Sequence, residues 1–260
     1  MLRTKKEKIY NKTKSSLYSI ISTASPYFKV KNISLKKPKF IFRKSFELAN
    51  KFFKKKIIDK KVLDIGSANG EFAYFFNKIT KNSNTFLGVD IHKPFTDLSN
   101  KKFSNKNITF INKNFFDLKS KYDLIFSHNT LAIFPDIRPA LKKIIYLLNK
   151  NGVAVINGRF NEADIDAIIK FKEEKTSKLW RSDFNIHSQK TINNYLKKYH
   201  KSIIWKFKKY YIDTNIKKRE KNPDIYHYTF KDSDKNIRIT SGLMQLHDNY
   251  FMIIKKFKWK

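Results

Sequence analysis

The sequence predicts an α/β fold, in which a doubly wound, mostly parallel sheet is flanked by helices and the C-terminal strands are antiparallel. Three observations favour this fold. Short apolar runs alternate with amphipathic segments from Lys61 onward, which is typical of parallel strands joined by helices. A glycine-containing loop, Gly66–Gly70, directly follows the first apolar run. After Gly158 the alternation gives way to separate helical and strand-like segments.

The regular alternation defines the elements of the first part of the chain. Helices are expected where apolar residues recur every three or four positions, and strands where short apolar runs end in loops. An amphipathic helix over Lys44–Lys55 comes first. The order that follows is a strand over Lys61–Ile65, a helix over Glu71–Thr80, a strand over Thr85–Asp90, a helix over Pro94–Lys102, strands over Ile108–Asn112 and Tyr122–Ser127, a helix over Ile137–Leu148 and a strand over Val153–Asn157.

The rest of the chain is predicted to hold helices and then strands. Residues 161–174 are expected to form a helix because Asn161 can cap it and acidic residues lie in its first turn. The remaining expected elements are a helix over Ser188–Tyr199, strands over Ile203–Phe207, Ile225–Lys231, Ile237–Gly242 and Tyr250–Phe257, and a hairpin turn over Asp232–Asn236.

These patterns divide the chain into three segments. Residues 1–57 form a basic N-terminal helical segment, and residues 58–158 form the core with its regular alternation. Residues 159–260 supply helices and strands that complete the sheet and a substrate pocket. The length of 260 residues fits one large domain or one domain with additions, and no internal repeat is present.

The composition excludes several kinds of site and location. Hydrophobic residues make up 41% of the chain, enough for a core, and cysteine is absent, so disulfides and thiolate metal sites are excluded. No run approaches the ~18 apolar residues of a membrane span. Serines interrupt the apolar patch Leu17–Ile21, which argues against a signal peptide. A cytoplasmic location is therefore expected.

The chain is strongly basic, with a formal net charge of +34. Such a charge predicts attraction to an anionic surface or RNA. However, few of the 56 basic residues are arginine, the residue that pairs bidentately with phosphates and base edges. Lysine, asparagine, isoleucine and phenylalanine abound, so a biased composition is the favoured explanation, and a functional anionic partner stays open.

Polar and glycine residues follow four of the predicted parallel strands. Ligands bind at the carboxyl ends of strands in an open α/β sheet. Gly66 and Gly70 allow the backbone to approach a ligand at the start of a helix. Asp90 follows the second strand, 20 residues after Gly70, where a carboxylate can accept hydrogen bonds from both hydroxyls of a ribose.

The third and fourth strands end in residues that suit a nucleoside and a reacting group. Asn114 and Phe115 follow the third strand, where an amide and an aromatic ring can hold an adenine; the alternative is a helix cap followed by core aromatics. Ser127 and His128 follow the apolar run of the fourth strand. A polar pair at that place indicates a site, although a simple loop is the alternative.

As an ordered set, these segments resemble class I S-adenosylmethionine-dependent methyltransferases. The resemblance covers about residues 58–158 and implies a Rossmann-like fold with S-adenosylmethionine as cofactor. It is carried by the motifs Val62–Gly70, Gly88–Ile91, Phe110–Leu118, Tyr122–Ser127 continuing to Asp136, and Leu147–Gly152.

The resemblance implies roles for individual residues. Gly66, Ser67 and Gly70 would line the methionine part of the cofactor, and Asp64 would support their loop. Asp90 would hold the ribose, Asn114 and Phe115 would border the adenine, and Ser127 with His128 would lie near the methyl group. Asn69 and Ile91 complete the expected cofactor-binding set.

Three departures from the family pattern narrow the alternatives. Ala68 stands where a central glycine is common, which also argues against a dinucleotide-binding oxidoreductase. Asn114 replaces an acidic residue, and Ala132–Ile133 replaces a frequent Glu-His pair. The segment after the fourth strand lacks the Asp/Asn-Pro-Pro-aromatic motif of DNA amino-methyltransferases. An RNA methyltransferase and a non-catalytic cofactor-binding homologue remain alternatives.

The predicted activity is O-methylation of a small molecule or carbohydrate. His128 is the first candidate for a general base and His187 the second, because imidazole has an ordinary pKa near 6.5. Tyr226 and His227 are weaker candidates. Three short motifs after residue 158 resemble methyltransferases encoded among bacterial surface-polysaccharide genes: Phe160–Asp164, Phe184–Ser188 and Gly242–His247.

Overall fold

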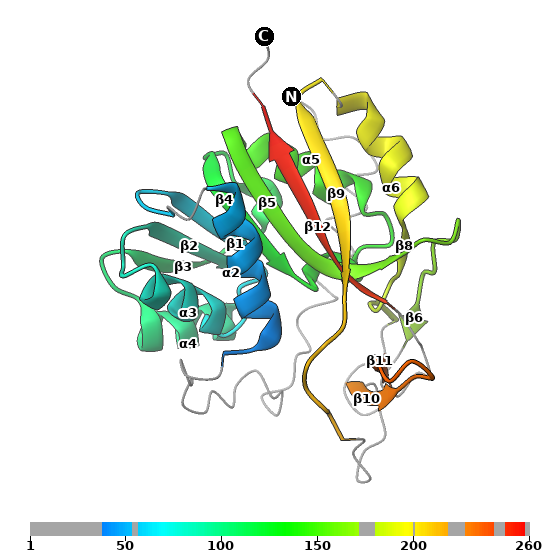
Figure 1. Ribbon diagram of the computed structural model, residues 1–260. Helices are drawn as coiled ribbons and strands as arrows, with labels where there is room; N and C mark the ends of the chain where they lie inside the picture. The colour runs from blue at the N-terminus through cyan, green and yellow to red at the C-terminus, as the bar shows by residue number, and fades with distance from the viewer. Residues whose placement is uncertain are drawn as a thin grey trace.

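A computed structural model describes residues 38–53, 57–171, 180–199, 201–217, 227–241 and 248–257 of the chain. Its centre is an eight-stranded sheet whose main path has the strand order β3-β2-β1-β4-β5-β12-β9, with β8 pairing β5 beside it. The pairs among β1 to β5 are parallel, whereas β12 runs antiparallel to both β5 and β9 (Figure 1). The prediction of a mostly parallel Rossmann-like sheet with antiparallel C-terminal strands is confirmed.

The elements of the first part lie close to their predicted positions. Helix α2 begins before its predicted start, and the predicted end of that helix lies outside the described residues. The observed elements are α2 (Phe40–Phe52), β1 (Lys61–Ile65), α3 (Glu71–Ile79), β2 (Thr85–Asp90), α4 (Lys93–Phe103), β3 (Ile108–Asn112), the 3-10 helix η2 (Phe115–Asp117), β4 (Tyr122–His128), η3 (Thr130–Ile133), α5 (Arg138–Leu147) and β5 (Leu148–Asn161).

The second part contains one wrong prediction, the helix over residues 161–174. Strand β5 continues to Asn161, which lies in register with Ser188 of β8, and Ala167 forms a bridge with Ile186. These pairings replace helical hydrogen bonds, and the chain passes through bends at residues 162–164. The other elements are β6 (Lys170–Phe171), β7 (Arg181–Ser182), β8 (His187–Ser188), α6 (Gln189–Leu196), η4 (Lys197–Tyr199), β9 (Ile203–Tyr210), β10 (His227–Lys231), β11 (Ile237–Ser241) and β12 (Asn249–Lys256).

The C-terminal strands divide between two sheets. Strands β9 and β12 extend the main sheet, whereas β10 and β11 form a separate hairpin through a turn at Asp232–Asn236. The predicted boundary at residue 158 falls inside β5. The C-terminal segment and the core therefore share one sheet.

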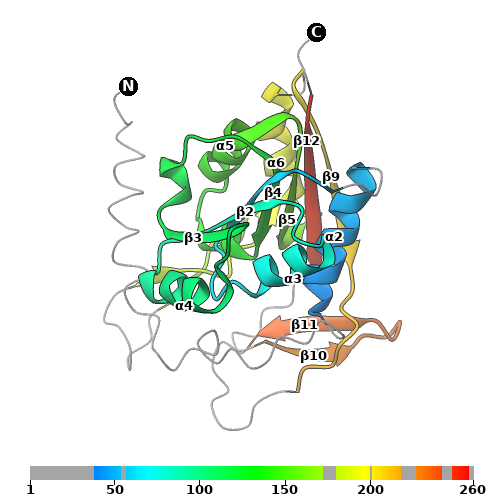
Figure 2. The ribbon, with the colours of Figure 1, turned by 90° about the vertical axis from the view of Figure 1, so that its left-hand side faces the viewer.

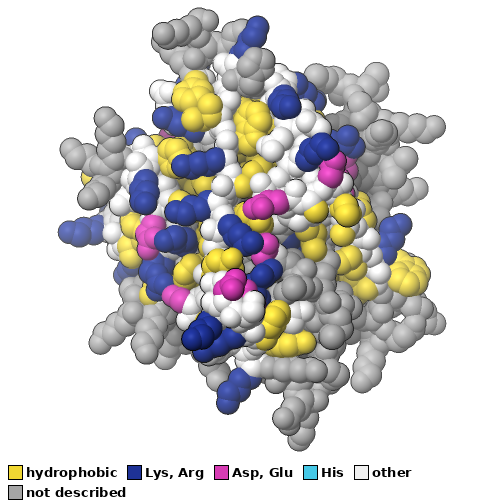
Figure 3. All heavy atoms as spheres, turned by 45° about the vertical axis from the view of Figure 1, so that its right-hand side comes forward, with side chains coloured by type: hydrophobic (Ala, Val, Ile, Leu, Met, Phe, Trp, Pro, Cys, Tyr) yellow, Lys and Arg dark blue, Asp and Glu magenta, His cyan; other side chains and the backbone are white. Residues whose placement is uncertain are grey.

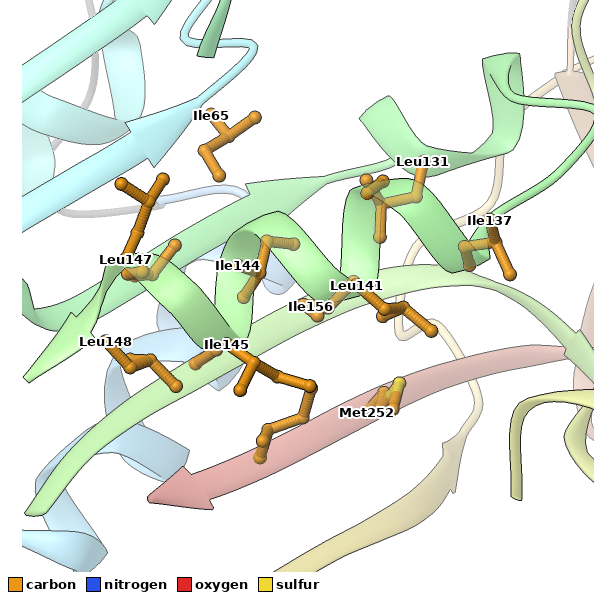
Figure 4. Close-up of a cluster of buried hydrophobic side chains, with 14 of the residues drawn as sticks. Ile65, Leu131, Ile137, Leu141, Ile144, Ile145, Leu147, Leu148, Ile156 and Met252 are labelled. Carbon is orange, nitrogen blue, oxygen red and sulfur yellow. The ribbon is translucent and has the colours of Figure 1, made fainter. Parts of the chain in front are cut away.

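Two hydrophobic layers cover the two faces of the sheet (Figure 2). Helices α5 and α6 pack on one face, where Leu141 and Ile144 of α5 lie against Ile156 of β5 and Met252 of β12 (Figure 4). Helices α2 and α3 pack on the other face, which is rich in phenylalanine. Burial of these side chains stabilises the sheet by about 25 cal/mol for each Å² of apolar surface.

Basic side chains are spread over the surface. On the face that Figure 3 shows, lysine and arginine side chains lie between acidic and apolar ones and form no single continuous patch among the described residues. No helix within the described parts of the chain is long and apolar enough to cross a membrane.

Candidate functional site

The loop between β1 and α3 adopts a backbone that requires glycine. Gly66 and Gly70 have φ angles of 74° and 76°, in the left-handed region. A Cβ atom on Gly66 would lie 2.2 Å from Thr130 Oγ1, and one on Gly70 would lie 2.8 Å from the Phe110 ring. Ala68 also has a positive φ, 44°, so the loop keeps its tight turn without a central glycine.

Asp90, at the end of β2, holds this loop from the side. Its Oδ2 accepts a hydrogen bond from the Ala68 N–H at 3.0 Å, and its Oδ1 accepts one from the His92 N–H at 2.9 Å. Burial raises the pKa of Asp90, and the hydrogen bonds from the backbone of His92 and Ala68 act in the opposite direction. A carboxylate offers about four acceptor sites, so two hydroxyl donors can still bind it.

Asp90 lines a pocket at the carboxyl ends of β1, β2 and β3. Its polar side is formed by Asp90, Lys113 and Asn114, and its apolar walls include the ring of Phe115. The Asn114 side chain accepts a hydrogen bond from the Phe116 N–H, which caps η2. The remaining lining residues are Ile65, Gly66, Val89, Ile91, Thr130, Ile133 and Phe134. A mostly apolar pocket beside a carboxylate has the chemical character that a nucleoside site needs.

Buried polar atoms without partners gather around the glycine loop. Asp64 Oδ1, Ser67 Oγ and Ser127 Oγ are buried and have no hydrogen-bond partner among the described residues. Burial, with the negative charge of Asp90 as a second cause, raises the pKa of Asp64 to about 8. Unsatisfied buried polar groups are rare in folded proteins, and a bound polar ligand is one explanation for a group of them. These atoms can receive the ammonium and carboxylate groups of an amino acid.

Asn69 lies in the glycine loop, and Ile91 lies beside Asp90 in the pocket. Asn69 is buried, and its Oδ1 accepts a weak hydrogen bond from the Glu71 N–H at the start of α3. Ile91 follows β2 and lines the pocket beside Asp90. The structure thus brings the predicted cofactor residues of the first three strands to one edge of the sheet.

His128 lies at the end of β4 beneath α2. Its Nε2 is 2.9 Å from Ser45 Oγ, its Nδ1 is 3.9 Å from Asp64 Oδ1, and its ring packs against Phe72 with centroids 4.4 Å apart. Burial, with the charge of Lys39 as a second cause, lowers the pKa of His128 to about 3. An imidazole with this pKa is neutral near pH 7 and is a weak proton acceptor.

His187, the second predicted base, lies in β8 beside η3. Burial lowers its pKa, and the charge of Asp166 and the nearby backbone of Leu131 and Phe134 act in the opposite direction. Its Nε2 is buried and has no hydrogen-bond partner among the described residues. His187 does not line the pocket that contains Asp90. The weaker candidate Tyr226 lies outside the described residues, as does the side chain of His227.

Three residues beside the site, Thr130, Ser45 and Asn157, were missed by sequence reasoning. Thr130 donates a hydrogen bond to the Ile65 carbonyl and covers Gly66, and Ser45 reaches His128 from α2. Asn157 and Tyr210 form a buried hydrogen bond on the same face of the sheet as His128. The only sequence signal was the placement of Asn157 at the end of a predicted apolar strand.

A family described as "Methyltransferase domain" matches residues 58–218. No curated protein matches the sequence.

Solved structures share the fold at low sequence identity. One is Burkholderia thailandensis 1,6-didemethyltoxoflavin-N1-methyltransferase with bound 1,6-didemethyltoxoflavin and S-adenosylhomocysteine; it is 14% identical with a TM-score of 0.55, over 99% of this chain and 92% of that one. Another is the YcgJ protein from Bacillus subtilis, 12% identical with a TM-score of 0.52, over 83% of this chain and 99% of that one.

Proposed function

The chain belongs to the methyltransferase domain family, and we propose that it transfers the methyl group of S-adenosylmethionine to an oxygen of a small molecule or carbohydrate. S-adenosylmethionine is the cofactor of this class of enzyme. The observation that carries the proposal is the position of Asp90 in an apolar pocket, next to buried polar atoms that lack partners.

We assign the nucleoside half of the cofactor to the pocket. Asp90 would accept hydrogen bonds from the ribose hydroxyls while it holds the loop at Ala68. Ile91, Asn114 and Phe115 would border the adenine. Because the Asn114 side-chain oxygen already caps η2, its amide N–H group is the part that can reach a ring nitrogen.

We assign the methionine half to the glycine loop. Gly66, Ser67 and Gly70 would lie against it, and Asn69 would support the loop at the start of α3. Asp64 would face the ammonium group, which offers the hydrogen-bond donor that its buried Oδ1 lacks. Ser127 is the register partner of Ile65, so its side chain lies on the other face of the sheet from that of Asp64, and it would lie near the methyl group. An ammonium beside Asp64 would also lower the pKa of its carboxyl group and favour the charged form.

The protein's part in the reaction is positioning. When bound, S-adenosylmethionine supplies an electrophilic methyl group on its sulfonium. The chain must exclude water and align the acceptor with that methyl group. His128 contributes as a neutral hydrogen-bonding group beside Asp64, because its lowered pKa makes it unsuitable as a general base at neutral pH. His187 is the remaining candidate for a base and would have to act from the side of η3.

The face that Figure 3 shows favours a small acceptor over RNA. The lysine and arginine side chains in Figure 3 are interspersed with acidic and apolar ones, whereas an RNA-binding face is a continuous basic track. We therefore favour a metabolite or a sugar, with bacterial surface polysaccharide as one source of it. The net charge of +34 keeps an RNA acceptor as the second candidate.

Calorimetry with S-adenosylhomocysteine tests the assignment of Asp90. The variant Asp90→Asn keeps the shape of the side chain and removes its charge, and Asp97→Asn is the matched control because Asp97 is an exposed partner of Lys93. We expect at least about tenfold weaker binding for the first variant and no change for the second, since a charged hydrogen bond contributes about 1.5–3 kcal/mol. Equal affinity of both variants would contradict the ribose assignment. No binding by the wild type would contradict the proposed function.

A further inference from the structure

A pair of polar residues lies in the hydrophobic layer between α2 and the sheet. Asn157 of β5 and Tyr210 of β9 are 0% and 8% exposed, and Asn157 Nδ2 donates a hydrogen bond to the Tyr210 hydroxyl oxygen at 2.5 Å. Tyr210 packs against Phe251 of β12 with ring centroids 4.7 Å apart. Phe40, in the first turn of α2, covers Tyr210 at 5.5 Å. The pair is therefore enclosed by aromatic side chains.

This pair has hydrogen-bonding capacity that the described residues do not use. Asn157 Oδ1 is buried and has no partner among them. The Tyr210 oxygen accepts from Asn157, and none of the described hydrogen bonds has its O–H as donor. Burial raises the pKa of Tyr210, so the hydroxyl keeps its proton. One acceptor and one donor thus remain side by side.

The surroundings give no structural reason for this polarity. On the same face, Val153 and Val155 precede Asn157 along β5, and Phe251 lies in register with it on β12. A leucine at position 157 and a phenylalanine at position 210 would continue that layer. Burying a polar group without its hydrogen bond costs about 1–3 kcal/mol, so the pair destabilises the free protein relative to apolar residues of the same size.

The backbone connects the pair with the proposed cofactor site. His128 and Asn157 are register partners on β4 and β5, and the Asn129 N–H donates to the Asn157 carbonyl at 2.9 Å. The next residue, Thr130, donates to the Ile65 carbonyl and covers Gly66. Asn157 therefore lies one strand away from Ser127 and His128 of β4 and two strands away from the glycine loop after β1, at the carboxyl end of the parallel strands.

We propose that Asn157 and Tyr210 bind the methyl acceptor and select a neutral group that both donates and accepts a hydrogen bond, namely a hydroxyl or an amide. This inference rests on the proposed function, because the acceptor must reach the methyl group beside the glycine loop. A carboxylate or phosphate has no proton for Asn157 Oδ1 and would be disfavoured. A cation that could attract such an anion, Arg159, lies two residues further along β5, and its guanidinium group packs over the Phe184 ring at 4.6 Å. Movement of Phe40 in the first turn of α2 would open the pair to the acceptor.

Acetamide and acetate test this selection, because they have nearly the same shape and differ in charge. Each is titrated into protein saturated with S-adenosylhomocysteine, and the side-chain amide signals of Asn157 are followed by ¹H–¹⁵N NMR. We expect acetamide to shift these signals with saturation and acetate to leave them unchanged. Equal shifts with acetate would overturn the selection for a neutral group. Absence of a shift with either probe would overturn the binding site.

Substitutions separate recognition from packing. Tyr210→Phe removes only the hydroxyl, and we expect it to weaken acetamide binding at least fivefold. Tyr250→Phe is the matched control, because its hydroxyl bonds Glu162 and its ring packs in the layer of α5 and α6 on the other face. Equal weakening by both would overturn the assignment. Asn157→Leu, followed by backbone amide signals, should abolish the response.

S-adenosylhomocysteine binding distinguishes the failure of this inference from failure of the proposed function. We expect its affinity to stay within about twofold of wild type in Tyr210→Phe and Tyr250→Phe. If the wild type binds S-adenosylhomocysteine and acetamide produces no shift, only the inference fails. If the wild type does not bind S-adenosylhomocysteine, the proposed function and the inference fail together.

Discussion

Substitution of Gly66 by alanine tests whether the turn after β1 is built around Thr130. Gly66 has a φ of 74°, and its new Cβ would lie 2.2 Å from Thr130 Oγ1 and 2.8 Å from Thr130 Cγ2. A left-handed backbone costs a non-glycine residue about 1–2 kcal/mol. Overpacking in a closely packed site costs a further ~1–3 kcal/mol. The free energy of unfolding should therefore fall by about 2–5 kcal/mol.

The double variant Gly66→Ala/Thr130→Ala separates these two costs. Thr130→Ala removes the colliding Oγ1 and Cγ2 atoms, and alone it loses a hydrogen bond to Ile65 worth about 1 kcal/mol. In urea denaturation the two substitutions should be coupled, so that Gly66→Ala costs only the backbone term, about 1–2 kcal/mol, when residue 130 is alanine. Gly158→Ala is the control, because Gly158 has no positive φ and the nearest atom to its Cβ would be in the Phe160 ring, at 3.0 Å rather than 2.2 Å.

The result that refutes this reasoning is additivity. If Gly66→Ala costs the same amount with threonine and with alanine at position 130, Thr130 does not occupy the space next to Gly66 in solution. A loss smaller than about 1 kcal/mol for the single variant would contradict the left-handed backbone as well. Either outcome would place the loop between β4 and α5 elsewhere and would change the walls of the nucleoside pocket.

Three further predictions concern the polar groups under α2. The raised pKa of Asp64 means that its carboxyl group holds a proton more tightly in the folded protein than in the unfolded chain. The stability of the ligand-free protein should therefore fall as the pH rises from about 4 to about 8. In thermal unfolding, the melting temperature of the Asp64→Asn variant should not show this fall. Ser45→Ala leaves His128 Nε2 buried without its partner, and urea denaturation should show a loss of about 1–3 kcal/mol, whereas a loss below about 0.5 kcal/mol would contradict the bond. The imidazole signals of His128 should not move between pH 5 and pH 8 in an NMR titration, and a midpoint near 6.5 would contradict the buried position.

The sequence predicted the part of the fold that repeats. From Lys61 to Leu148, helices and strands alternate with clear periodicity, and the structure places each within a few residues of its expected range. Periodicity failed at residues 161–174, where the acidic residues and Asn161 indicated a helix. There Asn161 pairs with Ser188 and Ala167 forms a bridge with Ile186, and contacts with a distant segment are not visible in local spacing.

The candidate site also combines residues that local sequence patterns could place with residues that depend on contacts between distant segments. Residues assigned to the cofactor follow strands β1, β2 and β3, and parallel strands bring their carboxyl ends together whatever the loops contain. Asp90 and the glycine loop could therefore be placed from sequence alone. Ser45 could not, because its contact with His128 depends on how α2 crosses the sheet.

The position of the proposed acceptor residues depends on a strand order that could not be predicted from the sequence. Strand β12 is the last strand in the chain, yet it lies between β5 and β9 and is antiparallel to both. This insertion sets the register that lets Tyr210 reach Asn157 across β12. A shift of β12 by one residue would turn its side chains to the opposite face of the sheet and replace Phe251 by a neighbour from the other layer. In the proposed assignment, Tyr210 lies on the C-terminal strand β9 and Asn157 on the parallel strand β5, so the acceptor site would need both parts of the sheet, whereas the glycine loop and Asp90 need only the parallel strands.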